Sequence, residues 1–154
     1  WFWVEKKRSF RFLCFFMKKI YFAGSIRGSN EAKDLYPEII RFLKNYGTVL
    51  TEHIWEQKTL KIQEQEISDE KIYHDDIAML ESCDIVIAEI TAPSLGVGYE
   101  IAYAEAHHKK IIALFNQTSG TKPSAMLNGN PNITLIYYSH FEKLKEQLIR
   151  LLSR

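Results

Sequence analysis

The segment ITAPSLGVGYEIAYAEA, residues 90–106, combines a serine, two glycines and one glutamate where a buried strand is expected to meet a helix. Gly96 and Gly98 let the backbone approach a ligand closely, and the free amides at a helix start favour an anion such as phosphate. Ser94 adds a hydroxyl beside them. The spacing matches neither the Gly-Lys-Ser/Thr phosphate loop nor the full dinucleotide fingerprint. Alone, it indicates either a phosphate site or only a tight turn.

Glu100 follows the glycines and is expected in the first turn of the helix, where the helix dipole favours an ionised carboxylate. Such a carboxylate can act as a nucleophile when it faces a cleft, although acidic residues also occur in first turns for helix stability alone. Tyr21, Asp76 and Asp84 lie on or beside neighbouring expected strands and could converge on the same cleft. Glycosyl transfer commonly pairs two carboxyl groups, one attacking the anomeric carbon and one handling protons.

Alternating strand-like and helix-like segments must position these residues. Strands are predicted at residues 18–24, 48–53, 84–90, 111–115 and 133–138, and helices at residues 31–47, 68–83, 98–110 and 140–154. The run DIVIAEI is apolar on both faces, which is typical of a central parallel strand. We therefore expect an α/β fold, a flavodoxin/Rossmann-like three-layer sandwich whose five-stranded parallel sheet has the order 2-1-3-4-5. Both glycine-bearing loops then lie at the switch point where ligands bind.

Composition sets the outer limits. The 154 residues, 46% hydrophobic and 25% charged, fit a single domain, and a net charge of +1 offers no basic field for nucleic acid. Two cysteines are too few for a disulfide framework and match no zinc pattern, so we expect a cytoplasmic setting and no metal. Residues 1–16 are aromatic, but charges break them far short of the roughly 20 apolar residues of a membrane span. We expect residues 1–16 to be an extension outside a domain at 17–154.

Four segments, in this order, resemble a known family: IYFAGSIRG, LTEH, CDIVIAEITAPSLGVGYEIAYA and PSAMLNG. They are similar to the 2'-deoxynucleoside 5'-phosphate N-hydrolases, a branch of the nucleoside 2-deoxyribosyltransferase family, over residues 18–154. The resemblance implies hydrolysis of the N-glycosidic bond of a 2'-deoxynucleoside 5'-monophosphate, giving a free base and 2-deoxyribose 5-phosphate. It implies no metal or organic cofactor, and the composition indicates no nucleic-acid or membrane partner.

The resemblance also implies roles for particular residues. Glu100 would attack the sugar carbon C1', Asp76 would assist proton transfer to the base and position water, and Tyr21 would orient the glutamate. Asp75 is the fallback for the adjacent Asp76. Ser124 would reach the phosphate from a second subunit, which requires at least a homodimer. The substrate-binding set that the resemblance implies is Gly24, Ile26, Arg27, His53, Asp84, Ser94, Gly96, Gly98, Ser124 and Met126.

Two other functions stay open at this point. A deoxyribosyltransferase would pass the sugar between bases on free nucleosides, and it would hold the 5'-hydroxyl with a carboxylate or amide from near a neighbour's C-terminus. This chain ends LIRLLSR and offers serines instead, which favours a phosphate. A non-catalytic nucleotide-binding module would use the same glycines without turnover. Base preference is undetermined, because residues 54–69, expected to form a variable loop with some helix, match no pattern.

Overall fold

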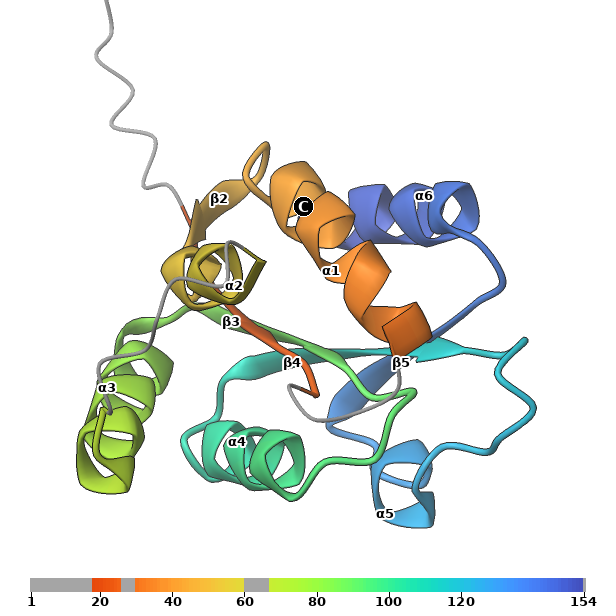
Figure 1. Cartoon of the computed structure of the whole chain (residues 1–154). Coiled ribbons are helices and arrows are strands. Elements are labelled where there is room, and N and C mark those ends of the chain that lie inside the picture. Colours follow the sequence, from red (N-terminus) through yellow and green to blue (C-terminus); the bar gives the residue numbers. More distant parts are fainter. Residues whose placement is uncertain (1–17, 26–29, 60–66, 154) are drawn as a thin grey trace, which may run out of the picture.

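A sheet of five parallel strands carries helices on both faces in this computed structural model (Figure 1). The structure describes residues 18–25, 30–59 and 67–153. The strands are β1 (Lys18–Ala23), β2 (Gly47–Val49), β3 (Ile85–Glu89), β4 (Lys110–Asn116) and β5 (Ile133–Tyr138). Their order is β2-β1-β3-β4-β5, which confirms the predicted fold class and strand order.

The helices divide between the two faces of the sheet (Figure 1). They are α1 (Asn30–Leu43), α2 (Glu52–Thr59), α3 (Asp69–Ser82), α4 (Leu95–Ala106), α5 (Ala125–Asn128) and α6 (Phe141–Leu152). Helices α1 and α6 pack on one face over a cluster that includes Ile87, while α3 and α4 pack on the other over a cluster that includes Val86. Strand β3 is buried along its whole length because both faces are covered. No helix within the described ranges is long and apolar enough to cross a membrane.

Strand β2 is shorter than predicted because a side chain, not its backbone, pairs with the end of β1. The Thr51 hydroxyl accepts a hydrogen bond from the Phe22 amide at 3.1 Å and donates one to the Phe22 carbonyl at 2.9 Å. Thr51 thereby satisfies both backbone groups that a longer β2 would have paired. The chain turns into α2 at Glu52, so the prediction of a strand to residue 53 is wrong. His53 consequently lies exposed in the first turn of α2 rather than at a strand end.

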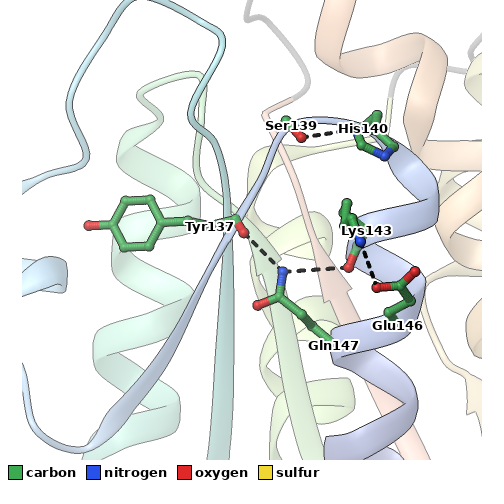
Figure 2. Close-up of polar contacts among 6 residues, drawn as sticks. All are labelled: Tyr137, Ser139, His140, Lys143, Glu146 and Gln147. Carbon is green, nitrogen blue, oxygen red and sulfur yellow. Dashed lines mark hydrogen bonds and ion pairs between the residues drawn. The ribbon is translucent and has the colours of Figure 1, made fainter.

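Helix α6 is fastened to the strands by backbone-directed side chains. Gln147 donates to the carbonyl of Tyr137, an outward-facing group of the edge strand β5, at 2.9 Å (Figure 2). At the other end of the helix, Lys18 of β1 and Lys110 of β4 each donate to a carbonyl of the last helical turn at 3.0 Å. Cations at a helix C-terminus are favourable because they meet its unpaired carbonyls. Together these contacts hold α6 across the sheet.

Replacing Thr51 with valine tests whether its hydroxyl ends β2. The Thr51→Val variant leaves the buried amide and carbonyl of Phe22 without a partner, so the free energy of unfolding should fall by about 1–3 kcal/mol in urea titrations. Thr134→Val, the same change at an exposed position of β5, is the control and should stay within about 0.5 kcal/mol of the parent. Equal losses in the two variants would contradict this role of Thr51.

Candidate functional site

The centre of the candidate site is a hydrogen bond between a strand and a helix. Tyr21 of β1 donates its hydroxyl proton to Oε1 of Glu100 on α4 at 3.0 Å. The Tyr21 side chain is 2% exposed, and burial raises the pKa of its hydroxyl, with the Glu100 and Asp76 carboxylates adding to the rise. Tyr21 therefore stays protonated at neutral pH and holds one oxygen of Glu100 in a fixed position.

Asp76 comes to the same place from α3. Its carboxylate lies close enough to the Tyr21 hydroxyl to raise that group's pKa. Asp76 is half-buried, four residues before the buried Leu80 and so on the same helix face. Asp75 instead is exposed and pairs with Lys71 at 2.8 Å. The structure thus brings Tyr21, Asp76 and Glu100 together and favours Asp76 over its neighbour.

The start of α4 differs from the prediction. The Ser94 hydroxyl accepts a hydrogen bond from the Val97 amide at 3.4 Å, and the Ser94 carbonyl accepts one from the Gly98 amide at 3.1 Å. This cap starts the helix three residues before the predicted start at Gly98. Glu100 consequently lies in the second turn, so its predicted first-turn position is wrong and the helix dipole favours its ionised form less. Packing and the bond to Tyr21 set its place instead.

The positions occupied by glycine in the candidate site differ in whether packing leaves room for a side chain. A Cβ atom on Gly24 would lie 2.8 Å from the ring of Tyr36, so internal packing requires glycine there. A Cβ atom on Gly98 would meet nothing within 4 Å, and one on Gly96 would make an ordinary contact at 3.8 Å. Neither has a positive φ. Contacts within the chain therefore do not explain Gly96 and Gly98, which leaves space for a ligand or a second chain.

A cavity of about 650 Å³ lies between the start of α4 and α5. Ser94 and Gly98 line it from one side, and Ser124 and Met126 line it from the other. Two serines predicted to bind phosphate therefore face one cavity within a single chain. Glu100 does not line this cavity, although it is only two residues from Gly98. The first two turns of α4 thus separate a ligand-sized space from the carboxylate.

Asp84 does not join the group, and its predicted substrate contact is wrong. It precedes β3, at the amino end of the sheet, whereas Ser94 follows β3 at the carboxyl end. Its Oδ2 accepts the Lys19 amide at 2.7 Å, and its own amide donates to the Lys19 carbonyl at 2.8 Å. Asp84 therefore aligns β3 with β1. In the part of the chain that the structure describes, no group of three or more His, Cys, Asp or Glu side chains is arranged to hold a metal ion.

Some predicted residues lie outside the described part of the chain, and one important residue was not predicted. Ile26, Arg27 and residues 1–16 fall outside the described residues.

Glu89, the last residue of β3, is fully buried and accepts hydrogen bonds from several side chains. An acidic residue inside the otherwise apolar run DIVIAEI was the available signal, because such a group is rarely buried without partners.

Comparisons with known proteins show related sequences and a shared fold. The nucleoside 2-deoxyribosyltransferase family profile matches residues 20–135. A Nematostella vectensis relative, provisionally named 2'-deoxynucleoside 5'-phosphate N-hydrolase 1, is 46% identical over 119 residues, spanning 75% of this chain and 79% of the relative. The human 5-hydroxymethyl-dUMP N-hydrolase is 43% identical over 111 residues, spanning 71% of this chain and 64% of the human protein. A solved CMP N-glycosidase from Clostridium botulinum shares the fold, with a TM-score of 0.65 and 22% identity over 88% of this chain and 100% of that one.

Replacing Gly24 and Gly98 with alanine distinguishes a glycine that packing requires from a glycine that faces open space. Gly24→Ala should lower the free energy of unfolding by about 1–3 kcal/mol, because its Cβ atom collides with the buried Tyr36 ring. Gly98→Ala is the matched control and should raise it by about 0.5–1 kcal/mol, because alanine stabilises a helix and the space is open. Urea titration measures both. Equal destabilisation by the two substitutions would show that Gly98 also serves internal packing.

Proposed function

Because this chain belongs to the nucleoside 2-deoxyribosyltransferase family, we propose that it is an enzyme that hydrolyses the N-glycosidic bond of 2'-deoxynucleoside 5'-monophosphates. The products are a free base and 2-deoxyribose 5-phosphate. The observation that carries the proposal is the partly buried hydrogen bond from Tyr21 to Glu100, which fixes a carboxylate beside a glycine-bearing helix start. The names of the relatives, all N-hydrolases, favour hydrolysis over base exchange.

In the first step, a carboxylate oxygen of Glu100 attacks C1' of the sugar. The bond from C1' to the base nitrogen breaks, its electron pair leaves with the base, and Asp76 supplies a proton to the base. In the second step, water attacks C1', gives a proton to Asp76, and the ester electron pair returns to Glu100. Tyr21 keeps Glu100 in place throughout. A 2'-deoxy sugar lacks an electron-withdrawing hydroxyl beside C1', so few protein groups suffice.

The phosphate rests at the start of α4 in this proposal. Ser94, the amide of Gly96 and Arg27 from the loop after β1 would supply the contacts, since charge-assisted hydrogen bonds to phosphate are strong. The Gly98 amide already donates to the Ser94 carbonyl, so Gly98 would contribute open space. Support comes from the two glycines, for which packing within the chain offers no reason. Further support comes from the cavity of about 650 Å³ beside Ser94.

A homodimer completes the proposed enzyme, with Ser124 reaching the phosphate of the neighbouring subunit. Leu95, Met126 and Tyr99 are 97%, 82% and 54% exposed, and they lie on α4 and α5, which cover the same face of the sheet. Large apolar side chains gathered on one face mark an interaction surface. Because Ser124 also lines the cavity beside Ser94 in its own chain, a contact within one chain is the alternative.

A cytoplasmic location is part of the proposal. Cys83 is a free, buried thiol, which suits the reducing setting that the low cysteine content predicts.

Product analysis tests the reaction. Purified protein is incubated with each deoxynucleoside 5'-monophosphate and with the matching unphosphorylated nucleoside, with and without an acceptor base. We expect base release from the monophosphates alone. Transfer of the sugar from an unphosphorylated nucleoside to the acceptor base would identify a transferase, and nucleotide binding without any base release would identify a binding module.

Glu100→Gln tests the nucleophile. The amide keeps the size of the side chain but cannot form the ester, so kcat should fall by about a thousandfold or more. Calorimetric affinity for the monophosphate should stay within a few-fold. Glu146→Gln, the same change in an exposed ion pair on α6, is the control and should keep the parent rate. A Glu100→Gln variant with a tenth or more of the parent rate would contradict the assignment.

Mixing two inactive variants tests the shared site. Ser124→Asp repels the phosphate and Glu100→Gln removes the nucleophile, so each should be inactive alone. Half of randomly formed dimers pair the two variants and carry one intact site, so an equimolar mixture should regain about a quarter of the parent rate. Ser119→Asp, a change at an exposed serine of the same loop, should stay active alone. No recovery in the mixture would place Ser124 in the site of its own chain.

A further inference from the structure

Glu89 is a buried carboxyl that the proposed chemistry does not use. It ends β3 on the face covered by α1 and α6, the opposite face from Glu100, and it is 0% exposed. The Tyr36 hydroxyl of α1 donates to its Oε2 at 3.3 Å, and the Tyr138 hydroxyl of β5 donates to its Oε1 at 3.1 Å. The Thr91 hydroxyl also donates to Oε1, and the Thr91 amide does so at 3.3 Å.

One of these hydroxyls also accepts a hydrogen bond from the backbone, and another lies beside a backbone group. The Asn116 amide at the end of β4 donates to the Thr91 hydroxyl at 2.8 Å. Burial and the Glu89 carboxylate raise the pKa of the Tyr36 hydroxyl, and the neighbouring Ser25 backbone opposes that rise. A hydroxyl that accepts an amide proton still has its own proton to donate, and here it points to Glu89. The carboxylate thus accepts directly from α1, from the segment after β3 and from β5, and Thr91 extends the group to the end of β4.

The Tyr36 ring connects the hydrogen bonds of Glu89 to the end of β1. Its edge lies where a side chain on Gly24 would be, and its centroid is 4.9 Å from that of Trp55 on α2. Ser25, the next residue, is buried. On the other side, Thr91 stands three residues before Ser94, the cap of α4. Glu89 therefore connects the chain leaving β1 with the chain that approaches the proposed phosphate site.

Packing of the hydrophobic core does not by itself explain the carboxyl group of Glu89. An apolar side chain at the end of a central strand would pack as well, and replacing buried ionic groups by apolar ones is often neutral or stabilising. Burial raises the pKa of the Glu89 carboxyl, so the protein holds this group against an energetic cost. The cost is understandable if the carboxyl sets the geometry of a site.

We propose that Glu89 is a positioning residue for phosphate binding, which holds the chain at Gly24 and Ser25 in register with the chain from Thr91 to Ser94. The inference rests on the proposed function, because that function places the phosphate at the start of α4. Glu89 touches neither the substrate nor Glu100, so it acts through Tyr36 and Thr91. Its loss weakens phosphate binding and leaves the chemical step in place.

Three conservative substitutions test this role. Glu89→Gln replaces one acceptor oxygen with a donor, and Tyr36→Phe removes the hydroxyl that joins Glu89 to the chain at Ser25. Tyr138→Phe removes a hydrogen bond to the same carboxylate from β5 but leaves the Thr91 hydroxyl and amide bonded to Glu89. We expect Glu89→Gln and Tyr36→Phe to raise KM for the monophosphate by about tenfold with kcat within about twofold. Tyr138→Phe, the matched control, should leave KM within about twofold of the parent.

Stability and phosphate affinity are measured on the same variants. A merely structural Glu89 predicts that KM follows the loss of stability in urea, equally for the two tyrosine variants, and that result would overturn the inference. Calorimetric titration with inorganic phosphate needs no turnover, so it should show the same order of affinities even if the parent releases no base and the proposed function fails. Unchanged phosphate affinity in Tyr36→Phe would likewise overturn the inference. Should Glu89→Gln fail to fold, the two tyrosine variants carry the comparison.

Discussion

The hydrogen bond from Tyr21 to Glu100 ties the first strand to the helix that follows the third, and the site depends on it. It can form only because β1 and β3 are neighbours in the sheet, which brings α4 over the Tyr21 face. Burial keeps the Tyr21 hydroxyl protonated, so it remains a donor at neutral pH. The same packing brings Asp76 on α3 near the pair. The carboxylate is thereby held in a fixed position, which the proposed attack on a sugar carbon requires.

The architecture could be predicted because it depends on patterns that any chain must obey. Strand and helix alternation, with one strand apolar on both faces, leaves few arrangements other than a parallel doubly covered sheet. The ends of the strands and helices were harder to predict. The end of β2 is set by the Thr51 hydroxyl on Phe22, a contact between residues far apart in sequence. The start of α4 was misplaced because the glycines suggested a loop, although Ser94 is a recognisable cap.

The group of Tyr21, Asp76 and Glu100 was predicted although its members come from three elements, whereas other contacts between elements were missed. Asp76 follows from its helical spacing to Leu80. Asp84 was expected to converge on the same cleft, although it begins its strand and so lies at the amino end of the sheet. Glu89 was missed because its partners come from α1, the loop after β3, and β5. Only the folded chain shows that one carboxyl accepts hydrogen bonds from three separate segments.

The stereochemistry of the reaction tests the central claim most directly. In buffer with methanol as a competing acceptor, the product methyl 2-deoxyriboside 5-phosphate keeps its anomeric configuration long enough for NMR. Attack by Glu100 followed by attack of methanol inverts C1' twice, so the account predicts the β anomer, the configuration of the substrate. The α anomer would show a single displacement by solvent, and Glu100 would then not be the nucleophile.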